Sequence, residues 1–199
     1  MSQHLVLHGL AVKKHADADA LTRFTGLPAA AVKSLLANLV RGGRVVETRG
    51  RYMVAPLARV VLEGQYATEY AALRGSPGFA AAHEAFERIN VLLKALITDW
   101  QTVSIGGSRV ANDHSDRDYD MSVIDRLGDL HAQAEGIIAR LQSEVPRFDY
   151  YARGLATALE RAEAGEREWV SDARIDSYHT LWFELHEDLL RLLGWQRRE

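Results

Sequence analysis

Hydrophobic residues recur at three- and four-residue steps along most of the chain, which is the spacing of one face of an α-helix. Beyond residue 78 this pattern predicts four helices, and a third helix among them starts near Pro146. Such stripes indicate core-facing surfaces first. Three of the stripes are Phe79, Phe86, Ile89, Leu93, Leu96 and Trp100, then Val123, Leu127, Leu130, Ile137 and Leu141, and finally Ile175, Tyr178, Trp182, Leu185, Leu189 and Leu192.

The first 74 residues predict a different order, namely three helices, a β-hairpin and a further helix. Asp17 or Asp19 is suited to start the second helix and Gly26 to end it. Pro28 stands in the first turn of the third helix, where a missing N–H costs little. The stretch "RVVETRGRYMVAP" predicts two short strands about a turn. The fold class expected for the whole chain is therefore mainly α.

A domain boundary is predicted in "RGSPGFAAAH", at residues 74–83, where glycine and proline interrupt the helical pattern. The charge changes sign there. Residues 1–74 hold 10 Lys and Arg against 5 Asp and Glu, and residues 75–199 hold 14 against 22. We therefore expect one domain over residues 1–74 and an acidic helical domain over residues 78–199, with different partners.

Composition narrows the class of protein. The chain of 199 residues has no cysteine, which excludes disulfides and thiolate metal sites. The first residues lack a basic leader followed by an apolar run, and no stretch reaches the ~20 apolar residues that span a bilayer. We expect a soluble cytoplasmic protein without a membrane partner.

The string "LTRFTGLPAAAVKSLLANLVRGGRVVETRGRYMVAP" resembles the winged helix-turn-helix of MarR- and GntR-type transcriptional regulators. Leu21 and Phe24 match the positioning helix, and Val32, Leu36 and Leu39 match the helix after the turn. The resemblance covers about residues 3–72. It implies a winged helix (three helices plus a β-hairpin) ahead of the all-α helical-bundle domain, and a protein that binds DNA as a homodimer.

The same resemblance makes residues 28–41 the recognition helix, which would enter the major groove. Three of its six outward positions are alanine, which reads bases poorly. A module that contacts proteins instead of DNA, accessory to a metabolic enzyme, therefore stays open as an alternative. The expected DNA-binding residues are Lys33, Ser34 and Asn38 on the helix and Arg44, Arg49 and Arg51 on the wing.

The stretch "IGGSRVANDHSDRDYDMSVI" resembles the signature of polymerase-β-like nucleotidyltransferases, in which Asp116 and Asp118 would hold magnesium. That fold needs a mixed sheet and a third carboxylate on a later strand, whereas the spacing after Ile124 is helical. A calcium loop also fails, because its sixth and twelfth positions are Met121 and Leu127. We expect a loop without catalytic residues that caps the following helix, and nucleotidyl transfer stays the second alternative.

The helical domain also carries histidines near carboxylates and aromatic rings. Such residues suit either a pocket for a divalent metal or small-molecule effector, or a polar network that fixes helix packing. The candidate pocket residues are His131, Asp176, His179, Trp182 and His186. The expected function is a transcriptional regulator, with no catalysis and no obligatory cofactor, whose helical domain dimerises or senses a small molecule.

Overall fold

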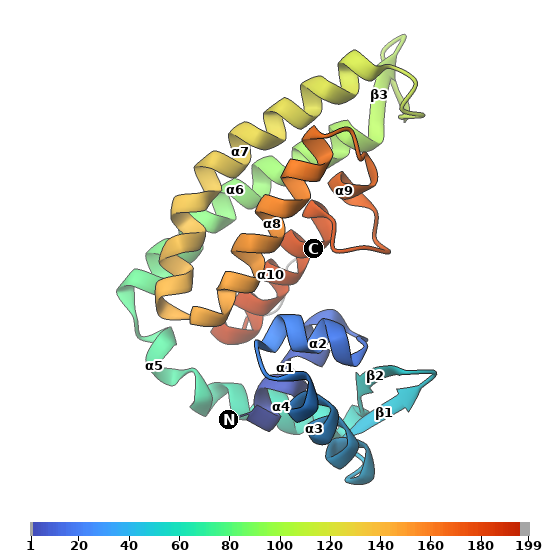
Figure 1. Cartoon of the computed structure of the whole chain (residues 1–199). Coiled ribbons are helices and arrows are strands. Elements are labelled where there is room, and N and C mark those ends of the chain that lie inside the picture. The colour runs from blue at the N-terminus through green and yellow to red at the C-terminus, as the bar shows by residue number, and fades with distance from the viewer. Residues whose placement is uncertain (1, 196–199) are drawn as a thin grey trace. The chain divides into compact units, whose positions relative to one another are not determined.

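The computed structural model describes residues 2–195, apart from the side chain of Ile105, and divides into two compact units. The first comprises Met1–Ser76 together with His186–Glu199, and the second comprises Pro77–Leu185. Most of the described chain is helical (Figure 1). The mainly α class predicted from the sequence is therefore confirmed.

The first unit has the predicted order of three helices, a hairpin and a helix. Its elements are α1 (Ser2–Lys13), α2 (Ala18–Thr25), α3 (Ala29–Arg41), β1 (Val45–Thr48), β2 (Arg51–Val54), α4 (Pro56–Glu69) and the short α5 (Ala71–Arg74). Strands β1 and β2 pair antiparallel, with Val45 opposite Val54 and Thr48 opposite Arg51.

Local chemistry sets the boundaries in this unit. The Asp17 carboxylate accepts the Ala20 N–H at 2.8 Å and so caps α2, while Gly26 ends it in the left-handed conformation with φ 67°. The turn between β1 and β2 needs positive φ at both central residues. Arg49 and Gly50 supply φ 52° and 76°, the geometry of a tight two-residue hairpin.

The core of the first unit forms around α1, which is buried from Val6 to Val12. Apolar residues from α2, α3, β1, β2 and α4 pack against it. Gly9 permits the close approach of α2, because a Cβ there would lie 2.8 Å from the Phe24 ring. This helix therefore holds the unit together.

The first unit also includes the end of the last helix, α10 (Tyr178–Leu193). His8 and Asp188 are both fully buried, and the His8 Nε2 lies 2.8 Å from the Asp188 carboxylate. The other ring nitrogen lies 2.9 Å from the Tyr66 hydroxyl. Arg74 donates to the Leu192 carbonyl at 2.7 Å. The sequence analysis placed this segment in the rear domain.

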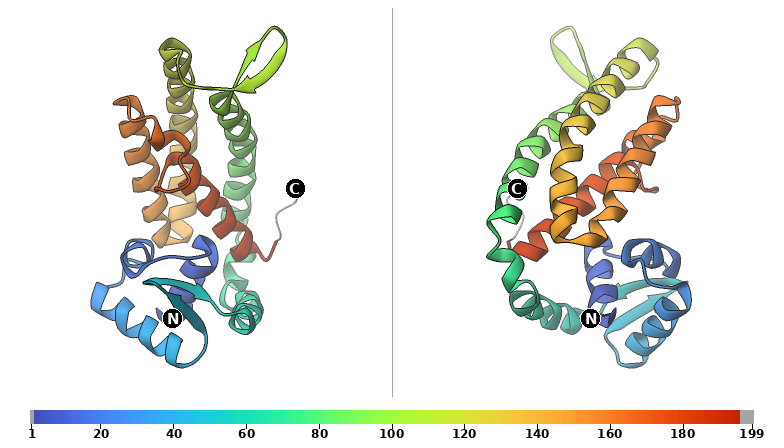
Figure 2. Two further views of the ribbon diagram at one scale, coloured as in Figure 1. Left: turned by 90° about the vertical axis from the view of Figure 1, so that its right-hand side faces the viewer. Right: turned by 60° about the vertical axis from the view of Figure 1, so that its left-hand side comes forward.

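The second unit is built on two long antiparallel helices, α6 (Pro77–Gln101) and α7 (Arg117–Glu144), joined by a β-hairpin (Figure 2). The hairpin consists of β3 (Thr102–Ile105) and β4 (Ser108–Ala111). After the 3₁₀ turn η1 (Pro146–Phe148) come α8 (Asp149–Glu163), α9 (Glu168–Ser171) and the first turns of α10. Ile175, which the sequence placed on the last helical stripe, precedes α10.

The start of α10 closes this bundle. Trp182 stacks on Phe86 of α6 with ring centroids 4.7 Å apart, and its indole N–H donates to the Asn90 amide oxygen at 3.1 Å. On α8, Gly154 leaves room for Leu181, since a Cβ there would lie 2.8 Å from that side chain. The aromatic residues of α10 are thus used for packing.

Among residues 2–195, no helix combines the length and the apolar character that crossing a lipid bilayer requires.

Removal of the Asp188 carboxylate should destabilise the first unit. The Asp188→Ala change leaves the buried His8 N–H without this acceptor, so the free energy of unfolding should fall by about 3 kcal/mol. The matched control is Arg153→Ala, which breaks an exposed pair with Asp149 and should cost under about 1 kcal/mol. Urea denaturation measures both, and equal losses would contradict the prediction.

Candidate nucleic-acid interface and a buried polar network

The outward face of α3 carries Lys33, Ser34 and Asn38, all three of them exposed. The opposite face is buried through Val32, Leu36 and Leu39. No acidic residue occurs in α3. This face can therefore approach a polyanion without like-charge repulsion from its own helix.

The tip of the β1–β2 hairpin presents Arg49 and Arg51, both exposed. The one acidic residue of the hairpin, Glu47, accepts the Gly50 N–H at 2.7 Å and so belongs to the turn. One residue beyond the turn pair Thr48–Arg51, Tyr52 of β2 exchanges two backbone hydrogen bonds with Ala16, at 2.8 and 3.1 Å. The hairpin is thus fixed to the helices while its cationic tip stays in solvent.

Arg44 differs from Arg49 and Arg51, because it is half-buried and donates to the Gln3 side-chain oxygen at 3.2 Å. Asn38 accepts from Arg41 at 3.3 Å, a contact that a base edge could replace. Residues 29–54 contain five basic residues and one acidic residue. Of the expected DNA-binding residues, all except Arg44 are exposed, and α3 and the hairpin position them within one unit.

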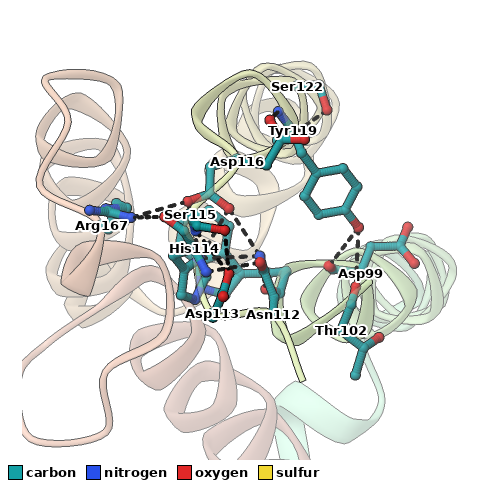
Figure 3. Close-up of polar contacts among 12 residues, drawn as sticks. Asp99, Thr102, Asn112, Asp113, His114, Ser115, Asp116, Tyr119, Ser122 and Arg167 are labelled. Carbon is teal, nitrogen blue, oxygen red and sulfur yellow. Dashed lines mark hydrogen bonds and ion pairs between the residues drawn. The ribbon is translucent and has the colours of Figure 1, made fainter. Parts of the chain in front are cut away.

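In the second unit, the loop before α7 closes around the buried Asp120 carboxylate, which is 3% exposed. Figure 3 shows Asn112, His114 and Arg167, which contribute to this network. The His114 Nδ1 lies 3.0 Å from it, and the Asn112 amide donates to it at 3.0 Å. Arg167, from the segment before α9, lies 3.5 Å from the same carboxylate and donates to the His114 carbonyl at 2.5 Å. One carboxylate therefore joins two segments of the unit.

The contacts of His114 and Asn112 hold the turn before α7. An N–H on the His114 Nδ1 can donate to the Asp120 carboxylate that this nitrogen faces. The two amide hydrogens of Asn112 go to Asp120 and to the Trp100 carbonyl. The imidazole lies against the Trp100 ring, with centroids 4.5 Å apart, and its backbone φ is 58°. The arrangement orients the histidine and stabilises an unusual turn.

The two aspartates of the nucleotidyltransferase-like motif lie at the start of α7 instead of on a strand. Asp116 is the N-cap and accepts the Tyr119 N–H at 3.0 Å, as expected for a capping loop. Asp118 is exposed in the first turn. Asp113 accepts from Ser115, which lowers the pKa of the Asp113 carboxyl. These positions do not form the strand-borne carboxylate pair that the motif requires, and β3 and β4 form a sheet of two strands.

The candidate pocket residues of the helical domain lie on α7, just before α10 and along α10. His131 is buried and its Nδ1 lies 3.2 Å from the Tyr178 hydroxyl, and Trp182 is bonded within the bundle. Asp176 and His179 are half-buried, and Asp176 precedes α10. His186 belongs to the first unit. Within the part of the chain that the structure describes, no three His, Cys, Asp or Glu side chains are placed to hold a metal ion.

Burial has opposite effects on the His131 and Tyr178 side chains. Desolvation lowers the pKa of the His131 imidazole and raises the pKa of the Tyr178 hydroxyl. Desolvation also lowers the pKa of His83 on α6. All three residues are therefore uncharged at neutral pH, which suits packing groups inside the bundle.

The Asp120→Asn change should weaken the loop network. An amide accepts fewer hydrogen bonds than a carboxylate and cannot pair with Arg167, so the free energy of unfolding should fall by about 1–3 kcal/mol. Asp118→Asn, two residues away and exposed, is the matched control and should change it by under about 0.5 kcal/mol. Thermal and urea denaturation would measure both. A null effect at Asp120 would show that the network does not stabilise the unit.

Acidification through the ordinary range of histidine should destabilise the second unit. The folded-state pKa values of His83 and His131 lie below the unfolded value, so the unfolded state binds more protons near pH 6. Stability should then rise as the pH increases from about 5 to 7. In the His83→Gln/His131→Gln variant the urea midpoint should depend less on pH. If the urea midpoint of the variant changes with pH as steeply as that of the parent, these two histidines are not the cause of the pH dependence.

Neither a family model, nor a curated protein, nor a solved structure matches the chain. The exposures, contacts and charges described above are the observations that bear on its function.

Proposed function

We propose that the first unit binds duplex DNA, with α3 directed to the major groove and the β1–β2 hairpin on the adjoining backbone. The chain would act as a transcriptional regulator of the winged-helix type, as a homodimer. The observation that carries the proposal is the joint exposure of Lys33, Ser34 and Asn38 on α3 with Arg49 and Arg51 at the hairpin tip.

Two structural features support the winged-helix interpretation of this unit. The order of its elements is the one expected for that fold, and the bridge between Ala16 and Tyr52 adds backbone pairing to the outer side of β2. An α-helix fits the width of the major groove, where Lys and Asn side chains bind base edges. The hairpin arginines would bind phosphate, or enter the minor groove.

The alanine-rich face of α3 predicts that base-specific contacts contribute less to DNA binding than contacts with phosphate. Ala29, Ala30 and Ala37 offer base edges no hydrogen bond, so Lys33 and Asn38 carry most of the direct readout. The larger contribution would come from the cationic groups, through release of counterions from the DNA. We therefore expect strong salt dependence and modest discrimination between sequences.

A second candidate function is a protein-interaction module without DNA binding. Its support is the outer side of α4 in the same unit, where Leu57 and Val60 are 84% and 67% exposed. Adjacent exposed apolar side chains of this kind are typical of a surface that another protein covers. DNA binding with a measurable salt slope would separate the two functions.

The test of DNA binding uses two variants with different expected effects. Arg49→Ala/Arg51→Ala should weaken binding to all sequences alike and reduce the salt slope by roughly one for each lost phosphate contact. Asn38→Ala should cost about 1–3 kcal/mol at a single base position and leave the slope nearly unchanged. Selection of bound fragments from a random pool, followed by titration at several salt concentrations, measures both effects.

The control variant Arg140→Ala/Arg153→Ala removes the same charge from exposed positions of the second unit. It should leave both affinity and salt slope near the parent values. If the parent protein shows no salt-dependent binding near 50 mM salt, a condition that favours phosphate contacts, the regulator is excluded and the interaction module is favoured.

A further inference from the structure

Helix α6 has an outward face that no described part of the chain covers. Its inward face is buried from Phe79 to Trp100 through ten residues. On the outward face Val91 and Leu92 are 65% and 51% exposed. Other exposed positions of this face include Ala80, Ala81, Glu84, Arg88 and Ala95. Exposed β-branched and leucine side chains next to alanines on one helical face are typical of helix-pairing surfaces.

Two opposite charges lie in the middle of this face. Glu84 and Arg88 are one helical turn apart and both are exposed, which is the spacing of a favourable pair within one helix. Within residues 2–195, neither forms an ion pair. Each is therefore available to a charge on another molecule.

We infer that this face binds the same face of a second copy of the chain, with the two α6 helices antiparallel about a twofold axis. The axis lies level with Phe86 along the helix, midway between Glu84 and Arg88. In such a pair, each residue lies opposite the residue equally far beyond the axis. Glu84 of each copy then lies opposite Arg88 of the other, which gives two ion pairs.

The same register also matches the sizes of the apolar side chains. It places Val91 opposite Ala81 and Leu92 opposite Ala80, at both ends of the contact. A large side chain thus meets a small one four times, which lets the helix axes approach to about 8 Å. One charge pattern and one size pattern therefore select a single alignment.

Neighbouring alignments lose this match. With the axis level with Arg88, the two arginines face one another and Glu84 lies opposite Leu92. With the axis level with Glu84, the two glutamates face one another. Like charges in contact are destabilising, so the face discriminates between registers as well as binding.

This interface would form the homodimer of the proposed function, and in that respect the inference rests on the proposed function. Dimer formation is measured without DNA, however. A chain that dimerises through α6 but ignores DNA would refute the proposed function and retain this interface. A chain that binds DNA but does not dimerise through α6 would refute this interface and retain DNA binding.

Charge reversal on α6 gives the primary test. Glu84→Arg places two arginines against each other at both ends of the charged contact, and Arg88→Glu does the same with glutamates. Each should raise the dimer dissociation constant roughly tenfold or more at low salt. The double variant Glu84→Arg/Arg88→Glu restores both pairs and should dimerise like the parent. Sedimentation equilibrium over a concentration series measures these constants.

Cysteine cross-linking tests the register, because the chain has no cysteine of its own. A chain with Ala81→Cys mixed with a chain with Val91→Cys should form a disulfide-linked heterodimer on mild oxidation. Ala81→Cys alone should not cross-link, because its two copies lie about 15 Å apart along the helix pair. Cross-linking of Ala81→Cys alone would overturn the register.

The matched control is Leu57→Glu/Val60→Glu on α4, which changes an exposed apolar surface of the first unit. It should leave the dimer intact. The inference is overturned if the parent is monomeric at all concentrations tested, if the single charge reversals do not weaken the dimer, or if the α4 variant dissociates it. Failure of the double variant to dimerise, while circular dichroism shows native helicity, would also overturn it.

Discussion

A carboxylate with no access to solvent lies at the centre of the first unit, and the unit depends on its partner. Asp188 can be buried there because His8 donates to it from α1, the helix around which the core forms. Tyr66 lies 2.9 Å from the other ring nitrogen, and Arg191 bonds to the Tyr66 hydroxyl. Residues from α1, α4 and α10 therefore share one chain of hydrogen bonds, which gives the core a single arrangement.

The second unit uses the same physical device. Asp120 is buried and meets His114 and Arg167, from segments that apolar packing alone would leave free to shift. Apolar contacts stabilise any closely packed arrangement, because they have no preferred direction. A buried carboxylate is stable only in the arrangement that places hydrogen-bond donors next to it. Each unit thus combines an apolar core, which favours compactness, with a buried aspartate that links segments far apart in sequence.

The sequence predicted the features that local chemistry determines. Periodicity located the helices, Asp17 and Asp116 behaved as caps, and Arg49 with Gly50 formed the expected turn. It did not predict that His8 would meet Asp188, because the pair is separated by 180 residues and no local pattern encodes it. For the same reason, no sequence pattern indicated that the end of α10 groups with the first unit. The one available signal was an isolated polar residue within an apolar helix, "LVLHGL".

Under the proposed function, the chemistry of α3 gives the pairing of two copies a role in DNA recognition. A helix with three alanines on its outer face would discriminate weakly between bases, whereas its lysine and the hairpin arginines would bind any phosphate backbone. A single copy would therefore bind many sequences with similar affinity. Two copies held together must find two suitable half-sites at a fixed spacing, and the second binding event becomes intramolecular. Under the proposed function, selectivity would then arise from the fixed distance between two weakly selective helices, and the surface that joins the copies would contribute to recognition although it touches no base.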